Sequence, residues 1–185
     1  LNGDVGTGKT VVATFASYVA AQAGYQTIWL APTEILAEQH YKTLKKLLTP
    51  FHIPVYLYTS SHRLDNSEFR IKNSVLIGTH AILNKHDLLG YLGLVIIDEQ
   101  HRFGVVQRTL LREKRSVGGH VRVPHFLSMT ATPIPRTLAL ALYGDLDLSV
   151  LDEYPSGRKT IKTRLVAPAD RQKAYQFMRA QVKAG

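Results

Sequence analysis

Cysteine is absent from the 185 residues, and methionine and tryptophan occur only twice and once. The absence of cysteine excludes disulfides, thiolate metal sites and cysteine nucleophiles, and it fits a reducing cytoplasm. No apolar run approaches the roughly 20 residues that a membrane-spanning helix needs, and no signal peptide is visible. We therefore expect a cytoplasmic globular protein with no membrane partner.

Acidic residues are a minority, with 14 Asp and Glu against 23 Lys and Arg and a formal net charge of +9. The excess is concentrated in residues 104–124, with five basic residues against one acidic, and in residues 158–173, with six against one. Such patches favour phosphate-rich partners. On charge alone, a basic solvated surface is an equally good interpretation.

Short β-branched runs alternate with longer helical patterns, which is typical of βα units on a parallel sheet. Because the runs lack polar alternation, we expect helices on both faces of that sheet. The expected strands are Thr27–Ala31, Val55–Tyr58, Ser74–Gly78, Leu94–Asp98 and His125–Met129, and the expected helices are Lys9–Ala23, Glu34–Leu48, Val105–Lys114 and Pro135–Tyr143. Thr33 is a good N-cap for the second helix, and Gly24 ends the first. The core-like spacing of Phe15, Tyr18, Tyr56 and Tyr58 argues against base stacking by these rings.

Proline, serine and glycine gather with charge in residues 152–160, which predicts a linker. Residues 1–151 before it form the expected α/β domain, whose first strand is cut short. After the linker, Thr160–Val166 is predicted to be a strand and Asp170–Lys183 a helix. These two elements have no remaining sheet to join, so residues 161–185 are interpreted as the beginning of a second domain.

The turn GDVGTGKT matches the phosphate-binding pattern G-x-x-x-x-G-K-[S/T], and it consists of Gly3, Asp4, Val5, Gly6, Thr7, Gly8, Lys9 and Thr10. Glycines let backbone N–H groups curl around a phosphate, and a helix that starts near Lys9 directs the positive end of its dipole at the anion. Lys9 can reach the β- and γ-phosphates, and the Thr10 hydroxyl suits Mg²⁺. The turn therefore predicts a nucleotide site.

The second motif, LVIIDEQH, places two acidic residues at the end of an expected buried strand. Ligands of open parallel sheets gather at the carboxyl ends of the strands. Strand alternation turns the side chains of Asp98 and Glu99 to opposite sides, so the two carboxylates can differ in role. Asp98 suits Mg²⁺ or its water, and Glu99 suits orienting and deprotonating an attacking water. The alternative is a pair of surface acids at a strand end.

The motifs GDVGTGKT, APTEILAEQH, GTHAIL, IIDEQHRFGVVQR and TATPIPRTLA occur in the order found in superfamily-2 helicases. The chain resembles the RecG family in particular, over essentially its whole length. The resemblance implies a RecA-like P-loop NTPase lobe with a parallel sheet flanked by helices, followed by a truncated start of a second lobe. It also implies an ATP-dependent DNA helicase that uses ATP and Mg²⁺ and remodels stalled forks and Holliday junctions in recombination and repair.

The resemblance assigns catalysis to Lys9, Asp98 and Glu99, and Mg²⁺ binding to Thr10 and Asp98. It assigns a DEQH box to Asp98, Glu99, Gln100 and His101, and the coupling of the γ-phosphate to the DNA-facing surface to Thr130, Ala131 and Thr132. Contact with the DNA backbone is assigned to Pro32, Thr33, Gly78 and Thr79. Thr33 can instead act only as a helix cap. The implied partners are branched DNA and, in the same parent chain, a second motor lobe and a wedge domain. A fragment without those domains is expected to hydrolyse ATP weakly or not at all.

Two other functions compete with this interpretation. The motor lobe of a transcription-repair coupling translocase shares TATPIPRTL and HRFGV, whereas the DEQH box and the P-x-G-R linker favour RecG. A non-catalytic, nucleotide-dependent nucleic-acid-binding module belongs to another class. The intact Lys9, Thr10, Asp98 and Glu99 argue against that module.

Overall fold

The structure is a computed structural model and describes residues 1–99, 115–117, 120–131, 147–153 and 163–184. Several predictions lie outside these residues: the helices Val105–Lys114 and Pro135–Tyr143, and the site residues Gln100, His101 and Thr132. The chain divides into two compact units, Leu1–Pro155 and Ser156–Gly185, at a point inside the predicted linker. The role of the shorter unit as the start of a second lobe stays a prediction.

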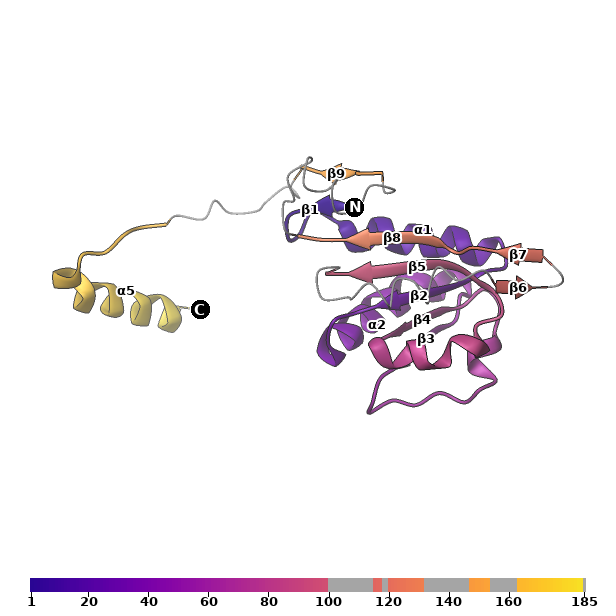
Figure 1. Cartoon of the computed structure of the whole chain (residues 1–185). Helices are drawn as coiled ribbons and strands as arrows, with labels where there is room; N and C mark the ends of the chain where they lie inside the picture. Colours follow the sequence, from indigo (N-terminus) through magenta and orange to yellow (C-terminus); the bar gives the residue numbers. More distant parts are fainter. Residues whose placement is uncertain (100–114, 118–119, 132–146, 154–162, 185) are drawn as a thin grey trace. The chain divides into compact units, whose positions relative to one another are not determined.

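The larger unit contains, in chain order, β1 (Asn2–Gly3), α1 (Lys9–Gln22), β2 (Gln26–Leu30), α2 (Glu34–Leu48), η1 (Thr49–Phe51), β3 (Val55–Tyr58), η2 (Glu68–Arg70), β4 (Val75–Gly78), η3 (His80–Leu88), β5 (Leu92–Asp98), β6 (Arg115–Val117), β7 (His120–Arg122), β8 (His125–Met129) and β9 (Val150–Leu151). The elements denoted η are 3₁₀ helices. Figure 1 shows their arrangement.

The central sheet has the strand order β3-β4-β2-β5-β8, and every neighbouring pair is parallel. A parallel bridge between Asn2 and Thr130 joins β1 to the residue that follows β8. β1 also pairs in parallel with β9. The predicted α/β fold with a parallel sheet is confirmed, and all five predicted strands are present within two residues of their expected bounds.

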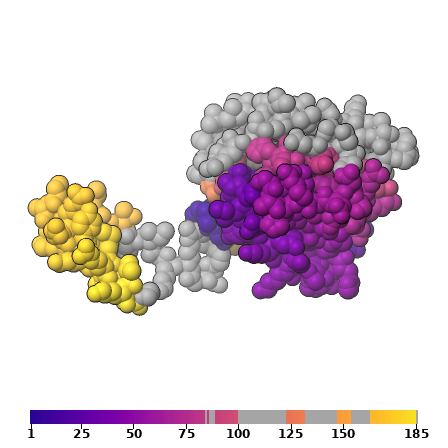
Figure 2. All heavy atoms as spheres, turned by 90° about the horizontal axis from the view of Figure 1, so that it is seen from below, coloured from indigo at the N-terminus to yellow at the C-terminus, as the bar shows by residue number. Residues whose placement is uncertain are grey.

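Alternate residues of the strands pack into two apolar layers, one on each face of the sheet. Trp29, Ile77 and Ile96 lie in the layer that contains residues of α1 and α2. Their neighbours Ile28, Leu76 and Val95 lie in the other layer, with residues of η2 and η3. Because both faces are covered, the strands read as unbroken apolar runs in the sequence. Figure 2 shows the described atoms of this unit packed against one another.

The ends of the first two helices follow local rules that the sequence reveals. The Thr33 hydroxyl accepts a hydrogen bond from Leu36 N at 3.3 Å, so Thr33 caps α2 as predicted. Gly24, directly after the C-cap of α1, has a φ of 81°, a left-handed conformation that favours glycine. Both helices therefore begin and end close to the expected residues.

Two expectations about packing are wrong. Phe15 is 65% exposed and stacks on Tyr18, whereas the buried face of α1 consists of Ala13, Thr14, Ser17 and Ala21. The strand predicted over Thr160–Val166 is also absent from its described part, Thr163–Val166, where the backbone is irregular. The side chain of Leu165 is fully exposed there, and a strand without a partner lacks its hydrogen bonds.

The smaller unit consists, in its described part, of a 3₁₀ helix η5 (Pro168–Asp170) followed by α5 (Arg171–Ala184). The predicted helix is confirmed with bounds shifted by one residue. Among the helices that the structure describes, none has the length and apolar character needed to cross a membrane.

We predict that Gly78→Ala lowers the free energy of unfolding by about 1–3 kcal/mol, as overpacking does. A Cβ at this position would lie 2.3 Å from the carbonyl oxygen of Tyr58, on the neighbouring strand β3. Gly90→Ala is the matched control, since an added Cβ there meets no described atom within 4 Å. Chemical denaturation measures both variants, and equal stability of the two would contradict this packing argument.

Candidate nucleotide site

The glycine-rich turn and the acidic pair lie at the same edge of the sheet. The end of β8 lies between them in the order of neighbouring strands. On one side, Gly3 N donates to the carbonyl oxygen of Thr130, the residue after β8, at 3.3 Å. On the other side, Asp98 of β5 is level with Met129 of β8. Because β1, β8 and β5 are parallel, the chain leaves β1 and β5 in the same direction. Two strand spacings separate them, about 10 Å. The turn and the acidic pair, far apart in the sequence, thus lie at one edge of the sheet.

The glycine-rich turn has the backbone that a phosphate-binding loop requires. Gly6 and Gly8 have φ angles of 86° and 92°, in the region that only glycine adopts freely. Among the described residues, a Cβ added at either position would meet nothing within 4 Å, so the loop borders open space in that part of the structure. A side chain at Gly3, by contrast, would lie 2.9 Å from Leu151 O. Gly3 is thus required by close packing against Leu151, whereas Gly6 and Gly8 border space that a ligand can occupy.

Lys9 is folded back onto the loop that precedes it. Its Nζ donates to the carbonyl oxygens of Gly3 at 2.7 Å and Asp4 at 2.9 Å. α1 begins at Lys9, and among the described residues no side chain caps the N-terminus of this helix at Gly8. The ammonium group and the first backbone N–H groups of α1 are therefore grouped around the turn, as an anion such as a triphosphate requires.

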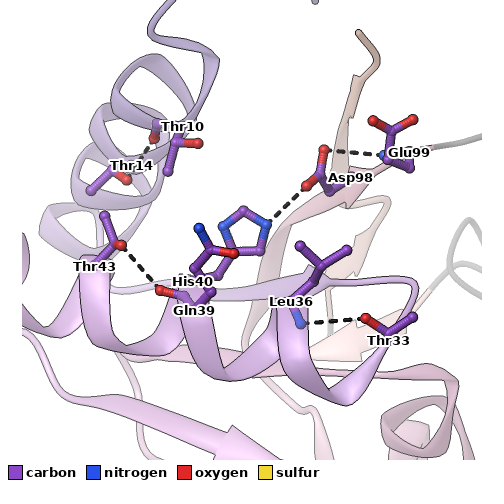
Figure 3. A network of polar contacts seen from close by, with 9 residues as sticks. All are labelled: Thr10, Thr14, Thr33, Leu36, Gln39, His40, Thr43, Asp98 and Glu99. Carbon is purple, nitrogen blue, oxygen red and sulfur yellow. Dashed lines mark hydrogen bonds and ion pairs between the residues drawn. The ribbon is translucent and has the colours of Figure 1, made fainter. Parts of the chain in front are cut away.

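The carboxylate of Asp98 is held at both oxygens. Oδ2 is 2.9 Å from His40 Nε2, and Oδ1 accepts a hydrogen bond from Glu99 N at 3.1 Å. Figure 3 shows the Asp98 carboxylate directed toward His40 and the Glu99 carboxylate directed away from it. The two acids thus face different surroundings. Glu99 lies just past the end of β5, so the turn there, and not strand alternation, sets the direction of its side chain.

Glu99 has a φ of 52°, an uncommon backbone conformation for a residue with a side chain. Such conformations cost free energy and cluster at functional sites. The turn after β5 therefore stores strain at the residue that the sequence singles out as a base.

His40 was missed as a site residue, although the sequence carries a signal for it. The buried positions of α2 are Ala37, His40, Leu44 and Leu48, which follow helical spacing. A polar side chain on such an apolar stripe needs a buried partner. That partner is Asp98, 58 residues further along the chain.

The residues present fit Mg²⁺ bound through a nucleotide. In the part of the chain that the structure describes, no group of three or more His, Asp or Glu side chains forms a metal site alone. Mg²⁺ is usually held by one or two carboxylates together with substrate phosphates. Asp98, at the edge where the loop and α1 begin, meets that requirement.

Comparison with known proteins places the chain in a family. The model of the DEAD/DEAH box helicases matches residues 1–141. The chain belongs to the DEAD/DEAH box helicase family. The whole chain is also similar to the ATP-dependent DNA helicases RecG of Aquifex aeolicus (46% identical), Synechocystis (47%) and Bacillus subtilis (44%). It covers 24%, 22% and 27% of those proteins, about a quarter of their length.

Solved structures agree with this family. A structure of RecG bound to a three-way DNA junction matches the whole chain with a TM-score of 0.82 and 41% identity, over 25% of that protein. The helicase domain of Pyrococcus furiosus Hef matches 84% of the chain, over 34% of its own length, with a TM-score of 0.55 and 20% identity. The second likeness shows the fold alone. The predicted resemblance to RecG is confirmed.

The helicase segments expected to contact DNA lie beside each other at the carboxyl edge. Leu30 of β2 is level with Gly78 of β4, and Ala31 N donates to Gly78 O at 2.9 Å. Pro32 and Thr33 follow the first strand, and Thr79 follows the second. Of these four residues, Thr33 is used as a helix cap and Gly78 is required by packing. Their contact with DNA stays a prediction.

A serine pair ties the start of α2 to the loop after β3. Glu34 Oε1 accepts from Ser60 N at 3.1 Å and also from the Ser60 hydroxyl, and Oε2 accepts from Ser61 Oγ at 3.0 Å. The Ser60 and Ser61 hydroxyls, together with Ser60 N–H and the nearby His62, lower the pKa of the Glu34 carboxyl. This contact orients the helix that directly follows the expected DNA segment Pro32–Thr33.

We predict that Glu34→Gln destabilises the fold at neutral pH and has progressively less effect as the pH falls below about 4.5, the ordinary value. The folded-state pKa is lowered, so the stabilisation by Glu34 is present above that pH and is lost as the carboxylate is protonated. Thermal unfolding across this range measures the difference. In a Ser60→Ala, Ser61→Ala background the substitution should have little pH-dependent effect, and an undiminished effect would contradict the proposed contact.

Proposed function

We propose that the chain is the ATP-binding motor lobe of an ATP-dependent DNA helicase that remodels branched DNA. The observation that carries this proposal is the parallel arrangement of β1, β8 and β5, which brings the phosphate-binding turn and the acidic pair to one edge. The 41% identity to RecG in a complex with a three-way junction supports branched DNA as the substrate.

In this proposal the turn Gly3–Thr10 and the first turn of α1 bind the phosphates of ATP. The backbone N–H groups hold phosphate oxygens, and Lys9 leaves the carbonyls of Gly3 and Asp4 to neutralise the β- and γ-phosphates. The Thr10 hydroxyl and the Asp98 carboxylate hold Mg²⁺. The metal, when bound, offsets the charge that develops on the phosphates.

Glu99 orients the attacking water and accepts its proton, because a carboxylate at the end of a strand can reach a ligand at that edge. Gln100 and His101 complete the DEQH box. Thr130 and Ala131, between the turn and the acidic pair, begin the Thr130–Thr132 segment that couples the γ-phosphate to the DNA-facing side.

DNA is held through its backbone phosphates by Pro32, Thr33, Gly78 and Thr79. These segments follow β2 and β4, which neighbour β5 in the sheet. Contacts that ignore the bases suit a motor that moves along any sequence. We further propose that a second motor lobe supplies the remaining catalytic groups, and a wedge domain the junction-splitting element.

Two variants of the complete helicase separate binding from chemistry. Glu99→Gln should retain ATP binding and lose about 10²–10⁴-fold in hydrolysis rate, which is the usual contribution of a general base. Lys9→Ala should lose ATP binding, whereas the exposed Lys46→Ala on α2 serves as its control. Hydrolysis and unwinding of a three-way junction are measured for each.

Hydrolysis by Glu99→Gln at the wild-type rate would remove Glu99 from its role. ATP hydrolysis that single-stranded, duplex and branched DNA stimulate equally would contradict branched DNA as the substrate.

A further inference from the structure

We propose that His40 is a positioning residue for the acidic pair, which fixes the Asp98 carboxylate for Mg²⁺ through its Nε2–H. This inference rests on the proposed function, because it concerns how the chain's own residues prepare the metal-binding carboxylate. His40 does not touch the nucleotide in this account and is not a catalytic residue.

The contact is short and sheltered from water. His40 Nε2 and Asp98 Oδ2 are 2.9 Å apart, and their side chains are 11% and 16% exposed. An ionised carboxylate can only accept hydrogen bonds, so the Nε2 atom carries the proton. In surroundings of this kind a hydrogen bond to a charged group is stronger than at an exposed surface.

The imidazole ring is itself held in place. Its centroid is 5.1 Å from that of Trp29, a fully buried residue of β2, and the ring lies on the buried face of α2. The direction of the Nε2–H bond is therefore set by two packed elements, a strand and a helix. Metal-binding carboxylates are commonly hydrogen-bonded by such supporting residues.

Together, His40 and the Glu99 N–H group fix the plane of the Asp98 carboxylate. Each carboxylate oxygen has a second lone pair, so both remain able to meet a metal ion or its water. Without His40 the carboxylate loses one of its two described anchors and is held only at Oδ1, by Glu99 N. The carboxylate can then rotate, and part of the Mg²⁺ affinity is lost to the cost of ordering it.

The test compares His40→Asn with His40→Gln in Mg²⁺ titrations of nucleotide binding, followed with a fluorescent ADP analogue. Both variants carry an amide, but only glutamine is long enough to place an N–H group where Nε2 stands in histidine. We expect the Mg²⁺ affinity of the nucleotide complex to fall about 10–100-fold in His40→Asn, as for other supporting residues. His40→Gln should restore most of it, and binding without Mg²⁺ should be unchanged in both.

The single tryptophan of the chain monitors packing in the same samples. Because Trp29 contacts the His40 ring, its emission shows whether either variant disturbs the core. Equal Mg²⁺ affinity of wild type and both variants would overturn the proposal, and so would equal losses in both. A wild-type chain that binds no nucleotide would instead overturn the proposed function, and this inference with it.

A measurement on the unmodified chain keeps the proposal testable if the variants fail to fold. Nitrogen NMR of the imidazole groups should show His40 protonated at Nε2, with that proton in slow exchange with water. A His40 ring protonated only at Nδ1 would contradict the proposed donor.

Discussion

The site depends on one constraint: β5 pairs in parallel with one edge of β8, and β1 bridges in parallel to Thr130, the residue that follows β8. Parallel strands leave a sheet in one direction, so the turn after β1 and the acids after β5 must meet at one edge. A shift of β8 by one residue would turn its side chains to the other face. The buried residue Met129, level with Asp98, resists that shift.

α2 adds a second support to the same edge. It begins directly after the Pro32–Thr33 segment, its first turn is tied to the loop after β3 through Glu34, and two turns later His40 contacts Asp98. A rigid helix therefore connects the segment proposed to contact DNA with the carboxylate proposed to bind Mg²⁺. A displacement of α2 would therefore act on the Asp98 carboxylate through the His40 contact.

Local signals in the sequence predicted much of the fold. The apolar runs gave the five strands because both sheet faces are covered, and Thr33 and Gly24 marked helix ends through their own backbone chemistry. The glycine-rich turn and the acidic pair were recognisable because phosphate and metal chemistry restrict which residue types serve there.

Features that depend on distant parts of the chain were not predictable in the same way. β4 lies between β3 and β2 in the sheet, and this strand order depends on contacts between distant segments that no local sequence pattern reveals. His40 could not be assigned to the site from the sequence, because its partner Asp98 lies 58 residues further along the chain and only the fold brings the two together. Phe15 has the spacing of a core residue, but its side chain is mostly exposed. The described part of the expected strand, Thr163–Val166, is not a strand, because a strand needs a partner as well as a suitable composition.

The most direct test of the shared site uses paramagnetic Mn²⁺ in place of Mg²⁺ in the nucleotide complex. The account predicts that NMR signals of both Thr10, at the start of α1, and Asp98, at the end of β5, broaden strongly on binding. Gly24, beyond the other end of α1, should keep a sharp signal. Broadening confined to one of the two elements would show that the turn and the acidic pair do not share one ion, and would contradict the account.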